Sequence, residues 1–146
     1  MDSVEYRIGY KKGVTTMKLD DFIPDKGTVV MCFEPAQGLT IEKARELFEQ
    51  VENESDLARI YVAVENKAWW ISHDVYDFDE GTKEYEEISK ISKAWFDLMK
   101  KIQASIYEIL KSEGVEISER GCIKVLEPFM RRNGYRNGNG WWIEDK

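Results

Sequence analysis

Short stretches of apolar residues, some of them alternating with polar residues, mark several segments of the chain. Alternation with a period of two is typical of a β-strand with one buried face, and a short continuous apolar run is typical of a strand buried on both faces. Five such segments occur before residue 75: residues 3–10, 14–19, 28–34, 59–65 and 68–72. The pair Asn66-Lys67 between the last two fits a two-residue turn. The pattern therefore predicts strands in these segments, with the last two joined as a hairpin.

Other segments have apolar residues spaced by three and four positions, which is typical of an amphipathic helix. Three segments show this spacing: residues 40–51, 82–112 and 118–133. Thr40 and Thr82 are good N-cap residues for the first two, and Gly114 is a natural stop for the second. Pro128 is expected to interrupt or kink the third helix. The helix near 82–112 would be about 46 Å long at 1.5 Å per residue.

A terminal β-hairpin is predicted near residues 134–146, because the turn sequence Asn137-Gly138-Asn139-Gly140 lies between two β-prone pieces. No linker rich in proline, glycine or serine divides the chain, which indicates one domain over residues 1–146. The predicted fold is a single α+β domain with an antiparallel or mixed sheet of about five to six strands and three helices. We expect the helix 82–112 to lie across this sheet with Trp95 as its main anchor. A homodimer through this helix, rather than a monomer, is the alternative.

Composition narrows the class of protein. The chain has 146 residues, 42% of them hydrophobic and 12% aromatic, which favours a folded core over disorder. No apolar run approaches the roughly 20 residues that span a bilayer, and the first residues lack the apolar region of a secretory signal. Cys32 and Cys122 are too few for a disulfide scaffold. We therefore expect a cytoplasmic protein with no membrane interaction.

Acidic residues dominate the charge, with 28 aspartates and glutamates against 21 lysines and arginines, a net charge of −7. A dense acidic segment follows His73, the only histidine, and supplies a candidate binding surface of five residues: Asp74, Asp77, Asp79, Glu80 and Glu84. Such a surface attracts a basic protein partner. The simpler interpretation is solvated charge that complements the dipole of the following helix. The spacing does not match a calcium-binding loop and there is no second histidine, so we expect no bound metal and no cofactor.

Aromatic and basic residues provide a second candidate binding surface: Trp70, Arg131, Arg132, Tyr135, Arg136, Trp141 and Trp142. Trp69 and Trp70 are adjacent, so on a strand their side chains would point to opposite faces of the sheet. Arginines interleaved with aromatic residues suit the stacking of exposed bases, and they equally suit the anchors of a protein interface. A hairpin docked on the core, with its arginines at a helix end, explains the same residues without any ligand.

Catalysis has the weakest support. His73 is the only side chain whose unperturbed pKa suits acid–base work near neutral pH, and Cys32 would serve as a nucleophile only if the fold brought it close to His73. No phosphate-binding glycine motif and no nucleophile elbow occurs. The sequence therefore favours a small acidic intracellular binding or regulatory protein that acts by protein–protein recognition, for example as an inhibitor or a nucleic-acid mimic. A nucleic-acid-associated module using the C-terminal segment is the first alternative, and a metal-dependent or cysteine enzyme is the second.

Overall fold

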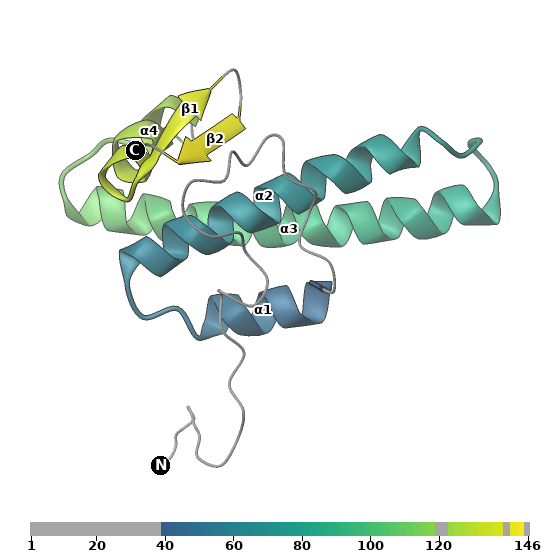
Figure 1. The fold of residues 1–146 in the computed structure, drawn as a ribbon, viewed down its shortest axis with the longest axis horizontal. Helices are drawn as coiled ribbons and strands as arrows, with labels where there is room; N and C mark the ends of the chain where they lie inside the picture. The colour runs from purple at the N-terminus through teal and green to yellow at the C-terminus, as the bar shows by residue number, and fades with distance from the viewer. Residues whose placement is uncertain (1–38, 119–122, 139–140, 145–146) are drawn as a thin grey trace, which may run out of the picture.

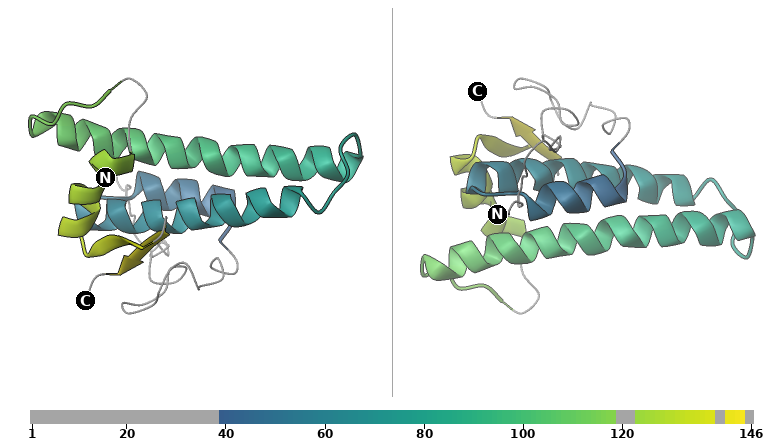
Figure 2. Two further views of the ribbon diagram at one scale, coloured as in Figure 1. Left: turned by 90° about the horizontal axis from the view of Figure 1, so that it is seen from above. Right: turned by 90° about the horizontal axis from the view of Figure 1, so that it is seen from below.

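The computed structural model describes residues 39–118, 123–138 and 141–144, which fold mainly as helices (Figure 1). These residues form four helices and one pair of strands: α1 (Ile41–Glu49), α2 (Glu54–Val75), α3 (Lys83–Ser112), α4 (Ile123–Arg132), β1 (Tyr135–Gly138) and β2 (Trp141–Glu144). The long helices α2 and α3 lie side by side and run in opposite directions, while α1 packs along one side of them (Figure 2). Helix α4 and the strands lie at the end where α2 begins and α3 ends.

The predicted α+β fold is wrong for the part of the chain that the structure describes. Instead of a sheet of five to six strands, this part is mostly helical, and its strands form one antiparallel pair in which Tyr135 faces Glu144 and Gly138 faces Trp141. That pair lies where the terminal hairpin was predicted. The predicted strands at 3–10, 14–19 and 28–34 lie outside the described residues.

Helix α2 contains both segments that the pattern predicted as a strand hairpin, 59–65 and 68–72. It crosses the middle of the molecule between other elements, so its buried residues do not form one narrow stripe: Leu57, Ala58, Ile60, Tyr61, Val62, Val64, Glu65, Asn66 and Ala68. A segment that is apolar on several sides has no clear period of 3.6, so its local pattern does not distinguish a buried helix from a buried strand. The pair Asn66-Lys67, predicted as a turn, lies inside this helix.

Local capping explains where the helices begin. The side chains of Thr40, Asn53 and Thr82 precede α1, α2 and α3 and accept hydrogen bonds from backbone N–H groups three residues later, at 3.2, 2.8 and 3.1 Å. At the end of α3, Gly114 has a φ of 88°, which glycine adopts without strain. The predicted helices at 40–51 and 82–112 are thereby confirmed, to within one or two residues at their ends.

The core lies where α2 and α3 face each other and where α4 covers one end of them. Tyr61, Ile102 and Ile106 are fully buried, and Phe129 of α4 is buried as completely. Trp95 is 2% exposed and is an anchor, as predicted. It packs in the helical core with the ammonium of Lys67 on α2 over its ring, not against a sheet.

Beyond α1, the end of α2 and the beginning of α3 continue together to the loop that joins them (Figures 1 and 2). Residues 69–91 make up this part of the molecule and are termed the arm. Among the described residues, no helix is both long enough and apolar enough to cross a membrane.

Candidate functional site

The arm concentrates the exposed apolar side chains. Six large hydrophobic residues are exposed among residues 39–118 and 124–136, whose side chains the structure describes, and five of them belong to the arm: Trp69, Trp70, Tyr76, Phe78 and Ile91. Tyr76 is 86% exposed and the other four are 41–48% exposed. Large apolar groups gathered on one exposed surface are typical of an interaction site, whereas single exposed ones are ordinary.

The two tryptophans of the arm lie on one helix, and the prediction that they sit on opposite faces of a strand is wrong. The ring of Trp69 meets the ring of Phe96 on α3 edge to face, with centroids 5.2 Å apart. Trp70 lies about 100° further around α2, and Asp74 follows it one turn later on the same side. Because Phe96 fixes one indole and the helix fixes the spacing, the arm presents aromatic and acidic groups in a defined arrangement.

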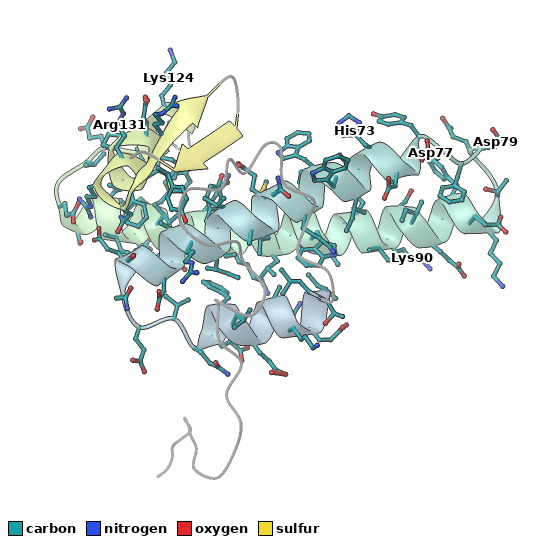
Figure 3. The ribbon with its side chains drawn as sticks, viewed as in Figure 1. His73, Asp77, Asp79, Lys90, Lys124 and Arg131 are labelled. Carbon is teal, nitrogen blue, oxygen red and sulfur yellow. The ribbon has the colours of Figure 1, made fainter. Side chains whose placement is uncertain are left out.

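Acidic residues outnumber basic residues along the arm. Between residues 69 and 91 there are seven aspartates and glutamates against two lysines. The five predicted acidic binding residues are all exposed on the arm: Asp74, Asp77, Asp79, Glu80 and Glu84. Figure 3 shows Asp79 at the tip, Asp77 beside it in the loop after α2, and His73 further back on α2. Glu84 also lies in the first turn of α3, where its charge complements the helix dipole.

The enzyme alternative depends on a metal site or on Cys32 and His73 lying close together. Among the described residues there is no group of three or more histidine, cysteine, aspartate or glutamate side chains that could hold a metal ion. The proposed nucleophile Cys32 and the second cysteine, Cys122, lie outside the described residues. His73 itself is exposed near the end of α2.

The second predicted surface does not adjoin the arm, although Trp70 does belong to the arm. Arg131 and Arg132 end α4, and Tyr135 and Arg136 begin β1. Figure 3 shows Arg131 at the opposite end of the molecule from His73, Asp77 and Asp79. Trp141 and Trp142 are the first two residues of β2, which pairs with β1 at that same end. The structure therefore separates the predicted aromatic and basic group into two distant parts.

Arg132 connects the ends of three helices. Its guanidinium donates to both carboxylate oxygens of Glu54 at the start of α2, at 2.8 and 2.9 Å, and to both oxygens of Glu113 after α3, at 2.9 and 2.8 Å. Asn133 Nδ2 adds a hydrogen bond to Glu54 at 2.9 Å. The hydrogen bonds from Arg132 hold the pKa of both carboxyls below their usual values. This guanidinium is occupied by the protein itself, so its evident role is structural.

Replacing Arg132 by alanine is expected to lower the melting temperature by about 3–5 °C, because two carboxylates lose their shared cation and three helix ends lose their link. Thermal unfolding followed by circular dichroism at neutral pH measures this. Arg131→Ala is the matched control: the ion pair of Arg131 is with Glu127 of its own helix, at 3.6 Å, and its loss should shift the melting temperature by less than about 1–2 °C. Equal shifts for the two variants would contradict the structural role of Arg132.

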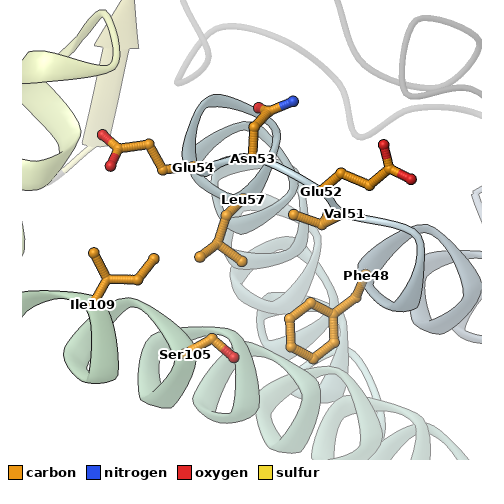
Figure 4. A pocket seen from close by; sticks show the side chains of 8 residues that line it. All are labelled: Phe48, Val51, Glu52, Asn53, Glu54, Leu57, Ser105 and Ile109. Atoms are coloured by element: carbon orange, nitrogen blue, oxygen red, sulfur yellow. The ribbon is translucent and has the colours of Figure 1, made fainter. Parts of the chain in front are cut away.

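A cavity of about 310 Å³ lies where α1, the start of α2 and α3 meet (Figure 4). Its lining residues are Phe48, Val51, Glu52, Asn53, Glu54, Leu57, Ser105 and Ile109. In Figure 4 the carboxylates of Glu52 and Glu54 point away from its centre, and Glu54 is already bound to Arg132. Small-molecule sites combine an apolar cavity with a few converging polar groups. This cavity lacks that convergence, so the arm is the stronger candidate.

Four exposed residues of the arm were missed from the sequence: Trp69, Tyr76, Phe78 and Ile91. A helical spacing of three, four and seven from Trp69 would have placed Tyr76 on its side of α2, but that spacing was hidden by the strand interpretation. Nothing local marks Phe78 or Ile91 as exposed.

Comparison with protein families, with curated proteins and with solved structures finds no match, so the function has to be inferred from the geometry of the chain itself.

Proposed function

We propose that this protein acts by binding another protein through the arm, and that the partner presents a basic surface with apolar side chains. The observation that carries the proposal is the coincidence of two properties in residues 69–91. This segment holds five of the six large exposed hydrophobic residues among those whose side chains the structure describes (39–118 and 124–136), and it has seven acidic residues against two lysines. Tryptophan and tyrosine are frequent anchors of protein interfaces, and complementary charge speeds the encounter with a partner.

The charge of the arm also bears on what the partner is. Two copies of this chain meeting arm to arm would bring like charges together, which is unfavourable. The apolar stripe of residues 82–112 that suggested a homodimer is largely used within the chain, because Trp95, Ile102 and Ile106 are buried in the core. A different, basic protein therefore fits this surface better than a second copy. An inhibitor that fills a nucleic-acid-binding cleft of its target is one form of this function.

The nucleic-acid alternative keeps less support. It relied on the arginines and aromatic residues of the C-terminal segment, and the guanidinium of Arg132 already binds the carboxylates of Glu54 and Glu113. Arg131 lies 3.6 Å from Glu127, so a phosphate would have to compete with that carboxylate. Most of the affinity for nucleic acid comes from basic groups that reach phosphates, and pairing with acidic groups reduces it.

Reversing the charge of the arm tests the proposal. The wild-type chain, immobilised, should retain a protein from nuclease-treated lysate of the source cells, and that protein is then purified. The triple variant Asp74→Lys, Asp77→Lys, Asp79→Lys should bind it at least about tenfold more weakly, with a flatter dependence on salt, because the attraction to a basic surface is lost. Isothermal titration calorimetry at two salt concentrations measures both effects.

The matched control makes the same charge change elsewhere. Glu46→Lys, Glu49→Lys, Glu52→Lys alters three exposed residues on α1 and just after it, away from the arm. This control should bind the partner with nearly wild-type affinity. If the control loses as much affinity as the arm variant, net charge rather than the arm controls binding. If neither variant loses affinity, the arm is not the binding surface.

A further inference from the structure

A hydrogen-bonded chain of polar side chains crosses the buried contact between α2 and α3. Gln103 Nε2 on α3 donates to the hydroxyl of Tyr61 on α2 at 2.9 Å, and this hydroxyl donates to Oε2 of Glu65 at 2.8 Å. Tyr61 is fully buried and Glu65 is 7% exposed. A carboxylate held this deep in a helical core is costly when it carries a charge, unless a cation balances it.

Among the residues that the structure describes, those that face Glu65 provide hydrogen bonding but no such cation. Burial is the main cause that raises the pKa of Glu65 to about 7, and the hydrogen bond from Tyr61 opposes it only in part. Burial is the main cause that raises the pKa of Tyr61 above its usual value, and the nearby Glu65 is the second cause. The hydroxyl of Tyr61 therefore stays protonated. On α3, the titratable group near this hydrogen-bonded chain is Tyr107, which also raises the pKa of Tyr61. Gln103, the other α3 residue involved, does not ionise. Of the described groups in and beside this hydrogen-bonded chain, Glu65 is the one whose charge changes near neutral pH.

The position of Glu65 connects this chain to the arm. Trp69, the first residue of the arm, follows Glu65 by one helical turn on α2. The hydrogen-bonded chain joins α2 to α3 within the core, where Tyr61 precedes Trp69 by eight residues and Gln103 follows Ile91, the last residue of the arm, by twelve. A change in packing at this point acts on the base of the arm.

We infer that Glu65 is a proton-sensitive lock at the base of the arm: neutral, it closes the contact between α2 and α3, and ionised, it draws in water and loosens that contact. The part of this inference that concerns regulation of partner binding rests on the function proposed above. The part that concerns the fold does not.

The direction in which pH changes the stability follows from the pKa of Glu65 in the unfolded and in the folded protein. In the unfolded chain Glu65 has a pKa near its usual value of 4.5, and in the folded chain the value is about 7. A raised pKa in the folded state means that the contribution to stability is complete below pH 4.5 and is lost as the pH rises through 7. Across that window the unfolding equilibrium constant should rise by about a hundredfold on account of this group alone.

Urea unfolding of the full chain between pH 5.5 and 8.5 tests the lock. The wild type should become less stable as the pH rises, whereas Glu65→Gln, which keeps the shape and the acceptor for Tyr61, should lose most of this dependence and be the more stable protein at pH 8.5. Glu46→Gln on the exposed surface of α1 is the control and should keep the wild-type dependence. The same pH dependence in Glu65→Gln and the wild type overturns the inference.

A second measurement does not depend on the stability of any variant. The carboxyl carbon of Glu65 in the wild-type chain, followed by NMR, should titrate near pH 7, and amide hydrogen exchange of residues 61–69 should quicken above that pH more than exchange in α4 does. A titration midpoint below pH 5 overturns the inference directly.

Binding separates this inference from the proposed function. With the purified partner, affinity of the wild type should fall severalfold between pH 6 and pH 8, and Glu65→Gln should fall less. If the lock is seen in unfolding and NMR but the affinities of the wild type and Glu65→Gln change equally with pH, regulation of the arm is overturned while the proposed function stands. If charge reversal on the arm leaves binding intact, the proposed function fails while the lock remains testable as a property of the fold.

Discussion

Trp95→Ala is expected to lower the free energy of unfolding by about 3–5 kcal/mol, the range seen when a large buried aromatic side chain is truncated. Trp95 is 2% exposed in the core, and the ammonium of Lys67 lies over its ring at 5.7 Å from the centroid. The two long helices are held together on both sides of this position, so they cannot close the space that the indole leaves. Urea unfolding at pH 6, monitored by circular dichroism, measures the loss.

Trp70→Ala removes the same atoms from the surface and is the matched control. Trp70 is 41% exposed, so its loss should change the free energy of unfolding by less than about 1 kcal/mol. The conservative variant Trp95→Phe, which leaves a smaller cavity, should fall between the two. Similar losses for Trp95→Ala and Trp70→Ala would contradict the arrangement of α2 and α3 described here.

Phe129→Ala is expected to cost a similar amount, about 3–5 kcal/mol, and to act on a different part of the molecule. Phe129 is fully buried on α4, and the guanidinium carbon of Arg132 lies 5.2 Å from the centre of its ring. Removing the ring takes away the main apolar anchor of a short helix and disturbs the support of Arg132. Amide hydrogen exchange should therefore show the loss of protection in α4 and β1 before it appears at the centre of α2.

Phe78→Ala, in the loop of the arm, is the control for this experiment because Phe78 is 41% exposed. It should leave both the free energy of unfolding and the exchange of α4 close to those of the wild type. If Phe129→Ala reduced protection evenly over all four helices, α4 would not be a separately anchored element.

Helices whose exposed side is polar were predictable from the sequence. Residues 82–112 keep one apolar stripe, and Thr82 and Gly114 mark the ends, so the periodicity and the caps agree. The same periodicity did not predict α2 as a helix, because other elements cover several of its sides. Its β-branched residues, among them Val62 and Val64, favour strands locally, and only packing in the core makes a helix the better solution.

The candidate site was predictable in part. The density of acidic residues singled out Asp74, Asp77 and Asp79, and they do lie on one exposed arm. The sequence also grouped Trp70 with Arg131 and Arg132, but these lie on separate elements, and the arginines are at the other end of the molecule from the acidic residues. Local patterns report residue types and not distances, so they cannot show which candidates share a surface.

The sequence by itself determined the net charge, the acidic segment, the caps of α1 and α3 and the amphipathic character of those helices, because each depends on residues within a turn or two of one another. Only the tertiary structure decided that α2 is a helix, that Arg132 binds Glu54 across 78 residues of chain, and that Gln103 meets Tyr61 beside a buried Glu65. These features depend on which distant side chains exclude water from one another. That exclusion arises only when the helices pack, and it gives the same residues a role that their neighbours in the sequence do not indicate.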